Sequence, residues 1–195
     1  MERDGFTRVL IAAASEETAR TLCGVIPDEF RTVGCVRSIR KAKQLVLEEK
    51  ADILILCSPL PDETGIRDVM ELGESGTAGI LLLVPQDSYA QAGCTAGKAG
   101  IFVLARPTGR QSIVQALRVL NTMKQQTDRL VRENRMLRKK LEDLRLVTRA
   151  KCLLIGKERM TEGEAHHYLE KLAMDSCITK REAATDIIRR MDAVS

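Results

Sequence analysis

Short, continuous apolar runs alternate with segments of helical periodicity over the first 120 residues. Five of these runs are rich in β-branched residues and have the length of strands: RVLIAAA, TVGCV, ADILILC, GILLLV and GIFVLA. Helical patterns separate the runs, and a fifth helix follows from about Gly109. Buried parallel strands are apolar throughout, because helices cover both faces of their sheet. The pattern therefore predicts an α/β domain over residues 1–120, with a doubly wound parallel five-stranded sheet.

Beyond Pro107 the chain has no proline, and its apolar residues follow a seven-residue repeat over residues 113–148. With the leucines at the d positions of the repeat, Asn134 falls at an a position. A buried asparagine at a favours a parallel two-stranded coil, because two facing amides satisfy each other in that register. The repeat predicts a coiled-coil helix that forms a homodimer through Leu130, Asn134, Leu137, Leu141 and Leu144. The alternative, that these leucines pack the helix against a domain of its own chain, stays open.

Residues 144–195 contain three helical segments: RLVTRAKCLLIGKER, TEGEAHHYLEKLAMDS and TKREAATDIIRRM. Thr161 precedes Glu164 by three residues, and Thr179 precedes Glu182 by three, which is the spacing of a capping box at a helix start. Apolar residues recur at helical spacing in the middle segment and are expected in a core: Ala165, Tyr168, Leu169 and Leu172. A small three-helix domain is predicted here.

Composition narrows the class of protein. The chain has 44% apolar and 30% charged residues, which is typical of a soluble globular protein, and no apolar run approaches the ~20 residues that span a bilayer. The N-terminus lacks the layout of a signal peptide, so we expect a cytoplasmic protein without membrane contact. The six cysteines form no C-x-x-C pair, which argues against a zinc knuckle or a disulfide framework.

Charge is distributed unevenly along the chain. Residues 1–110 contain 13 basic and 15 acidic side chains, whereas residues 111–195 contain 18 and 12. The basic excess is densest over residues 129–159, where 11 basic residues meet 4 acidic ones. Such a stripe favours a partner that carries phosphate groups, although a solvated helix face would have the same composition.

The N-terminal half resembles the receiver domain of response regulators, a flavodoxin-like fold. The segment ADILILCSPLPDETGI is similar to the third strand and following loop of that family, with its Leu-Pro-Asp…Gly turn at Leu60, Pro61, Asp62 and Gly65. The dipeptide Arg106-Pro107 stands where the family has Lys-Pro. The resemblance implies a phosphoryl-accepting aspartate, a pair of acids that holds Mg²⁺, a hydroxyl and a lysine at the strand ends.

This chain lacks those groups. The matching positions carry Cys57 for the aspartate, Ala13 and Ala14 for the acidic pair, Val84 for the hydroxyl and Arg106 for the lysine. Mg²⁺ needs hard oxygen ligands, and phosphoryl transfer needs the metal to neutralise charge. We therefore expect a degenerate phosphorylation site and no control by aspartyl phosphate. Cys57 could be an inert thiol or a redox-sensing one.

The C-terminal fifty residues closely resemble the ANTAR domain, the RNA-binding module of antitermination regulators. Three motifs carry this resemblance: Ala150-Lys151 with Leu153, Leu154 and Ile155; Met160, Thr161 and Ala165; and Leu169, Ala173 and Met174. Arg181, Glu182, Ala184, Ile187 and Ile188 match the last helix of the family. Cys152 stands where the family commonly has glycine, and Ala183 where it has a larger aliphatic residue.

The resemblance implies binding to paired small-loop hairpins in a nascent transcript, so that a competing terminator cannot form. Lysine and arginine would hold the phosphates. The candidate contacts are Lys151, Lys157, Arg159, Lys180 and Arg181.

Two rival functions remain at this point. The MDSCIT connection could imitate the turn of a helix-turn-helix, which would make the protein a DNA-binding response regulator. A signalling scaffold, regulated by a protein that docks on the receiver domain, is the other. The sequence has no acid–base pair, nucleophile–histidine set or phosphate loop, so neither an enzyme nor a cofactor is expected. His166 and His167 are adjacent, hence about 100° apart on a helix, so no shared metal site is expected.

Overall fold

A computed structural model describes residues 6–48, 50–63, 66–74 and 76–192. The chain forms two compact units: an N-terminal unit, residues 1–128, and a C-terminal unit, residues 129–195.

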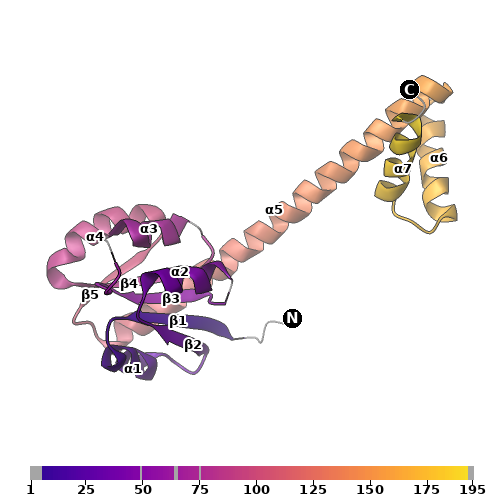
Figure 1. Ribbon diagram of the computed structural model, residues 1–195. Coiled ribbons are helices and arrows are strands. Elements are labelled where there is room, and N and C mark those ends of the chain that lie inside the picture. The colour runs from indigo at the N-terminus through magenta and orange to yellow at the C-terminus, as the bar shows by residue number, and fades with distance from the viewer. Residues whose placement is uncertain (1–5, 49, 64–65, 75, 193–195) are drawn as a thin grey trace. The chain divides into compact units, whose positions relative to one another are not determined.

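Within the described part of the N-terminal unit, five parallel strands form one sheet in the order β2-β1-β3-β4-β5 (Figure 1). The strands are β1 (Thr7–Ala13), β2 (Phe30–Val36), β3 (Ile53–Cys57), β4 (Gly79–Pro85) and β5 (Phe102–Arg106). This strand order is that of flavodoxin-like sheets. The predicted doubly wound α/β fold is therefore confirmed.

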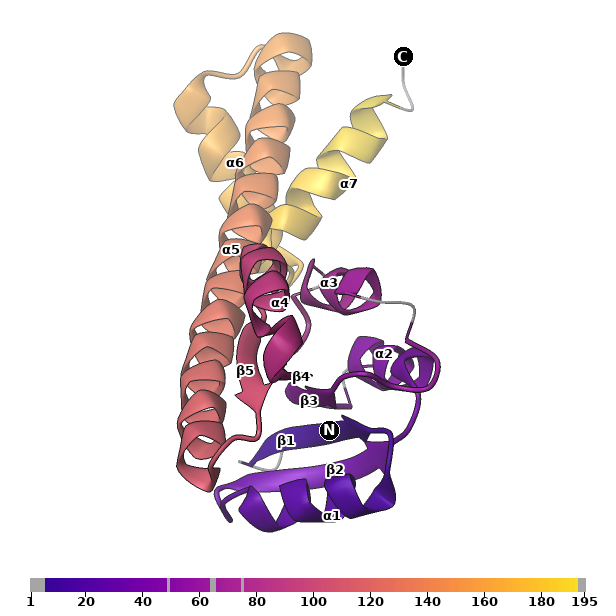
Figure 2. The same cartoon turned by 90° about the vertical axis from the view of Figure 1, so that its left-hand side faces the viewer.

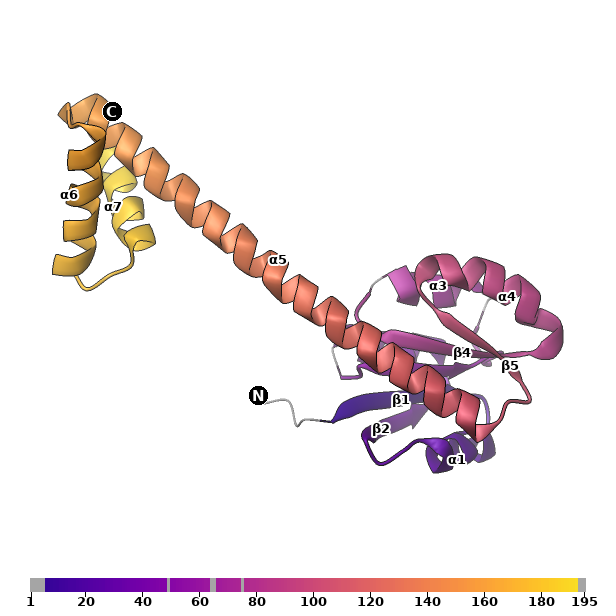
Figure 3. The same ribbon diagram turned by 180° about the vertical axis from the view of Figure 1, so that it is seen from behind.

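Helices cover both faces of this sheet. One face packs against α1 (Glu16–Val25) and the first turns of α5 (Arg110–Glu158), as Figure 3 shows. The other face packs against α2 (Ile39–Leu47), α3 (Ile66–Glu74) and α4 (Tyr89–Ala96), which Figure 2 shows side by side. Short 3₁₀ segments, Gln86–Ser88 and Gly97–Ala99, flank α4. Because neither face meets water, the central strands are apolar at successive positions, which is the pattern that predicted them.

Helix α5 is continuous over 49 residues. No proline lies within it, and its first glycine is Gly156, close to its end. The expected connecting helix and the expected first helix of the C-terminal domain are thus one helix. Its early turns bury Leu117 and Leu120 in the N-terminal unit, and its last turns bury Ala150 and Leu154 in the C-terminal unit.

The C-terminal unit consists of the last part of α5 with α6 (Glu162–Asp175) and α7 (Lys180–Asp192). Its buried core residues are Ala150, Leu154, Ala165, Leu169, Ala184 and Ile187. Both expected capping boxes are present: Thr161 pairs with Glu164 at the start of α6, and Thr179 pairs with Glu182 at the start of α7. The expectation that Tyr168 is a core residue is wrong, because this side chain is 42% exposed on α6.

Left-handed residues end two of these helices. Arg159 follows α5 with φ 57°, and Cys177 follows α6 with φ 50°. At Cys177 the backbone forms a Schellman motif, in which the N–H of Ile178 donates to the carbonyl of Ala173 at 3.0 Å and the N–H of Cys177 donates to that of Met174 at 3.1 Å. The direction in which the chain enters α7 is therefore fixed by the backbone.

Candidate nucleic-acid interface

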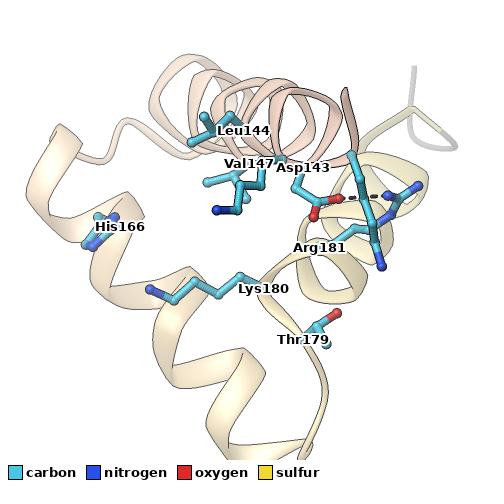
Figure 4. Close-up of a pocket in the computed structure, with 9 residues that line it drawn as sticks. Asp143, Leu144, Val147, His166, Thr179, Lys180 and Arg181 are labelled. Carbon is cyan, nitrogen blue, oxygen red and sulfur yellow. Dashed lines mark hydrogen bonds and ion pairs between the residues drawn. The ribbon is translucent and has the colours of Figure 1, made fainter. Parts of the chain in front are cut away.

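A groove of about 590 Å³ lies in the C-terminal unit, between α5 and the facing parts of α6 and α7 (Figure 4). Its lining residues come from three places in the sequence: Lys139, Lys140, Asp143, Leu144 and Val147 on α5, His166 on α6, and Thr179, Lys180 and Arg181 at the start of α7. The capping box at Thr179 sets the start of α7, and so places Lys180 and Arg181 in the first turn of that helix.

The groove combines an apolar floor with cationic walls. Leu144 and Val147 supply the floor, and Leu144 is 63% exposed. Four lysine or arginine side chains line the walls against a single lining carboxylate, that of Asp143. Such a site suits an anionic ligand with a flat apolar part, because the cations can hold the charges while the floor covers the apolar face.

Ion pairs within the unit orient the cations of α7. The Arg181 guanidinium donates from Nη1 to Oδ1 of Asp143 at 2.7 Å, which ties α7 to α5 across the groove (Figure 4). Lys180 Nζ donates to Oε1 of Glu170 at 2.7 Å. His166 Nε2 lies 3.2 Å from the same Glu170 oxygen.

Glu170 is thus shared between two groove residues. The hydrogen bond and charge of Lys180, followed by the charge of His166, hold the pKa of Glu170 below its usual range. The carboxylate is therefore ionised at neutral pH, and it competes with any anionic ligand for Lys180.

Three of the five candidate contacts from the sequence lie elsewhere in the unit. Lys151 pairs with Glu162, its side chain is only 18% exposed, and the pair lowers the pKa of Glu162. Lys157 donates to the backbone carbonyl of Met191 at 2.6 Å and so holds the end of α7 against α5. Arg159 is the exposed left-handed residue that follows α5.

A second, shallower hollow of about 420 Å³ follows the exposed face of α5. Most of its lining is cationic: Arg135, Arg138, Lys139, Leu141, Glu142 and Arg145. Lys139 lines both hollows. The basic stripe that the sequence indicated therefore continues along α5 next to the groove.

At the carboxyl ends of the sheet strands in the N-terminal unit, the residues that match the receiver family's phosphorylation site are mostly packed in the core. Ala13, Cys57 and Val84 are buried in the two cores, and Ala14 packs against one of them. Arg106 donates from Nη2 to the backbone carbonyl of Ser58, while its Nε atom is buried and has no hydrogen-bond partner among the described residues. Burial raises the pKa of the Cys57 thiol, and the nearby Arg106 charge offsets part of that shift.

Asp62, the acid of the expected Leu-Pro-Asp…Gly turn, caps a helix. Its carboxylate accepts from the Ser38 hydroxyl at 2.7 Å and from the N–H of Ile39 at 2.9 Å, at the start of α2. These bonds lower the pKa of Asp62. Gly65, the last position of that turn, lies outside the described residues.

Among the described residues, no group of three or more His, Cys, Asp or Glu side chains is placed to hold a metal ion. No helix in the described part of the chain is long and apolar enough to cross a membrane.

Comparison with known proteins identifies the two halves. The ANTAR domain family matches residues 135–188. The transcriptional regulatory protein PdtaR of Mycobacterium tuberculosis is 26% identical over 187 residues, which cover 94% of this chain and 90% of that protein. The chain therefore contains an ANTAR domain, and over most of its length it is similar to a transcriptional regulatory protein.

Solved structures show the fold of the receiver-like domain. The signal receiver domain of a putative Luxo repressor protein from Vibrio parahaemolyticus aligns with a TM-score of 0.57 at 20% identity, over 64% of this chain and 97% of that one. A CheY-like receiver domain protein from Methanospirillum hungatei aligns with a TM-score of 0.54 at 10% identity, over 63% and 98%. At these identities the likeness concerns the fold alone.

The groove brings two of the expected contacts of the ANTAR domain together, Lys180 and Arg181, and adds residues that sequence reasoning missed. Lys139, Lys140 and Val147 are the main additions, and Leu144 was expected only in the dimer seam. A signal for them was present in the sequence. Lys140, Leu144 and Val147 recur at helical spacing, so they share the face of α5 that the start of α7 approaches.

Proposed function

We propose that this protein is an ANTAR response regulator that binds RNA hairpins in nascent transcripts and so prevents terminators from forming. The groove of the ANTAR domain is the proposed contact surface. It has an apolar floor for an unpaired loop base and cations on two helices for the flanking phosphates, which is the chemistry by which proteins bind single-stranded RNA loops.

The observation that carries this proposal is that Lys180 and Arg181 of α7 line the same groove as Lys139 and Lys140 of α5 and the apolar floor. A duplex-DNA reader presents a helix face to the major groove, whereas here the cations converge on a hollow. Cations that converge on a hollow suit a single RNA strand that enters it. They suit the base edges of duplex DNA less well.

The test is hairpin affinity of the full-length protein at several salt concentrations. Lys180→Ala should weaken binding by about 1 kcal/mol, roughly fivefold, and should lower the slope of log K against log salt by about 0.7 to 0.9, the signature of one lost phosphate contact. The loss should be similar for different hairpin sequences.

Lys171→Ala is the matched control, because this lysine lies on α6 in the same unit but does not line the groove. It should bind as wild type does. Equal losses in both variants would contradict the groove as the contact surface, and tighter binding to duplex DNA than to hairpins would contradict RNA as the ligand.

We further propose that aspartyl phosphate does not control the receiver-like domain. At its strand ends, Ala13 and Ala14 supply no carboxylate to hold a metal, and Cys57 replaces the aspartate that would accept the phosphoryl group. Arg106, at the position of the family's lysine, donates a hydrogen bond to the Ser58 carbonyl.

The dimer seam is also part of the proposal. Leu130 and Leu137 are each 64% exposed on α5 in the described chain, Leu144 continues their seven-residue spacing, and Leu141 lies seven residues after Asn134. An apolar stripe of this kind fits a second copy of the same helix, with Asn134 facing its equivalent.

A further inference from the structure

The two cysteines Cys23 and Cys35 lie against each other in the receiver-like domain. Their Sγ atoms are 3.8 Å apart, although the residues belong to different elements, α1 and β2. Cys35 pairs in register with Ile11 of β1, whose side chain is buried on the face of the sheet that α1 covers. Cys23 packs against the same apolar cluster from α1. The contact therefore follows from the packing of α1 on this face.

The surroundings of the pair give it access to solvent. Strand β2 is an edge strand, paired only with β1 in the described sheet, and Cys35 is exposed on it. Cys23 is half-buried. A small oxidant can therefore reach the pair from solvent, while Cys57, the thiol at the degenerate phosphorylation site, is buried.

We propose that Cys23 and Cys35 are a modification site, a dithiol that hydrogen peroxide converts to an intramolecular disulfide. One thiolate attacks the peroxide, and an S–O bond forms as the O–O bond breaks. A sulfenic acid and hydroxide result, and the hydroxide takes up the proton that the thiol released and becomes water. The second thiolate then attacks the sulfenic sulfur, an S–S bond forms, the S–O bond breaks and a second water leaves. Both thiols are oxidised, and one peroxide is reduced to two waters.

The geometry sets what this step requires. A disulfide needs its sulfurs about 2.05 Å apart, so the two side chains must close the remaining distance by rotation about their χ angles. The bond would fasten α1 to the edge of the sheet. The disulfide would also be a covalent response to an oxidant, in a domain where Cys57 replaces the phosphoryl-accepting aspartate.

Burial and the neighbouring Cys23 raise the pKa of the Cys35 thiol. The thiolate is the reactive form, so the raised pKa places its formation at higher pH. The rate of disulfide formation should therefore rise as pH increases through the alkaline range.

The experiment treats the full-length protein with hydrogen peroxide, blocks remaining thiols and digests with trypsin without reductant. Arg20, Arg31 and Arg37 bound two tryptic peptides, TLCGVIPDEFR with Cys23 and TVGCVR with Cys35. The two peptides are adjacent in the sequence, so a disulfide is identified by a joined species that is cleaved after Arg31 and separates into both peptides on reduction. We expect the joined peptide, a loss of two of the six thiols, a single-chain mass on a denaturing non-reducing gel, and full recovery with dithiothreitol.

Variants decide which sulfurs react. Cys23→Ser and Cys35→Ser should each abolish the joined peptide, while Cys94→Ser, which removes another exposed thiol of the same domain, should retain it. Separate peptides after treatment, oxidation of Cys35 to sulfinic or sulfonic acid without a joined peptide, or a disulfide between two chains would each overturn the proposal. The peptide analysis of the peroxide-treated wild-type protein tests the proposal even if a serine variant fails to fold.

Discussion

Glu170 neutralises part of the positive charge that the groove presents to an anionic ligand such as the proposed RNA. It accepts from Lys180 and lies beside His166, and its lowered pKa keeps it ionised. An RNA phosphate must displace this carboxylate before it can pair with Lys180. The charge of the binding surface is therefore set by an acid that does not itself line the groove.

Glu170→Gln should strengthen hairpin binding. The substitution frees Lys180 and removes a repelling charge, and exposed ion pairs of this kind are worth on the order of 0.2 to 1 kcal/mol, so a gain of about two- to fivefold is expected. Filter binding at fixed salt measures it.

Glu162→Gln is the matched comparison, because it makes the same change of charge but frees Lys151, which does not line the groove. A smaller gain is expected there. If the two variants gain equally, the effect is one of net charge, or Lys151 contacts RNA as the sequence suggested.

Incubation with acetyl phosphate and Mg²⁺ should leave the protein unmodified. Ala13 and Ala14 offer no carboxylate to the metal, and Cys57 is buried in place of the aspartate. Intact mass measurement, with a phosphorylatable receiver domain as positive control, checks this. A stoichiometric adduct that hydroxylamine removes would show that another carboxylate accepts the phosphoryl group.

The sequence was informative about these strand ends and uninformative about the groove, for a physical reason. Each strand end follows directly from a local apolar run, so Cys57 and Val84 could be placed by reading along the chain. The groove depends on Arg181 meeting Asp143, which is 38 residues away, and on a fold that no local pattern encodes. Hence the sequence singled out two groove residues, Lys180 and Arg181, as candidate contacts but did not indicate Lys139, Lys140 and Val147.

At the scale of elements, helix ends were the most predictable features. The capping boxes at Thr161 and Thr179 are local, since each joins side chains three residues apart, and both are present. The left-handed residues at the ends of α5 and α6 were not predicted, because neither is a glycine. Arg159 and Cys177 nevertheless adopt positive φ, and backbone hydrogen bonds of a Schellman motif accompany it at Cys177.

Cys177→Gly should stabilise the ANTAR domain. A non-glycine residue in the left-handed region costs about 1 to 2 kcal/mol, and the greater freedom of glycine in the unfolded chain offsets part of the gain, leaving about 0.5 to 1 kcal/mol. Hydrogen exchange of the α6 and α7 amides should slow by about two- to fivefold.

Cys152→Gly is the control for this change. It makes the same substitution at an exposed position inside α5, where glycine is a weaker helix former than cysteine by roughly 0.3 kcal/mol, so exchange should become slightly faster. Faster exchange in both variants would mean that the backbone at Cys177 carries no strain.

For the whole molecule, the proposed seam predicts a dimer. Leu137→Lys places a charge at a d position, where the partner helix would desolvate it, and should convert dimers to monomers. Sedimentation equilibrium of the full chain measures the mass.

Met136→Lys provides the control. Met136 is the adjacent residue on the same helix and is also exposed, but it falls outside the a and d positions. This variant should keep the mass of the wild type. If Leu137→Lys leaves the mass unchanged as well, the leucine stripe has another role.

Leu144 belongs to both proposed surfaces, because it falls at a d position of the seam and on the floor of the groove. A partner helix and an RNA base would therefore meet the same side chain. Thermodynamic linkage then requires reciprocity: whatever factor dimerisation applies to the affinity for RNA, RNA must apply to dimerisation. One leucine would thus make the oligomeric state of this regulator a function of the transcript it holds.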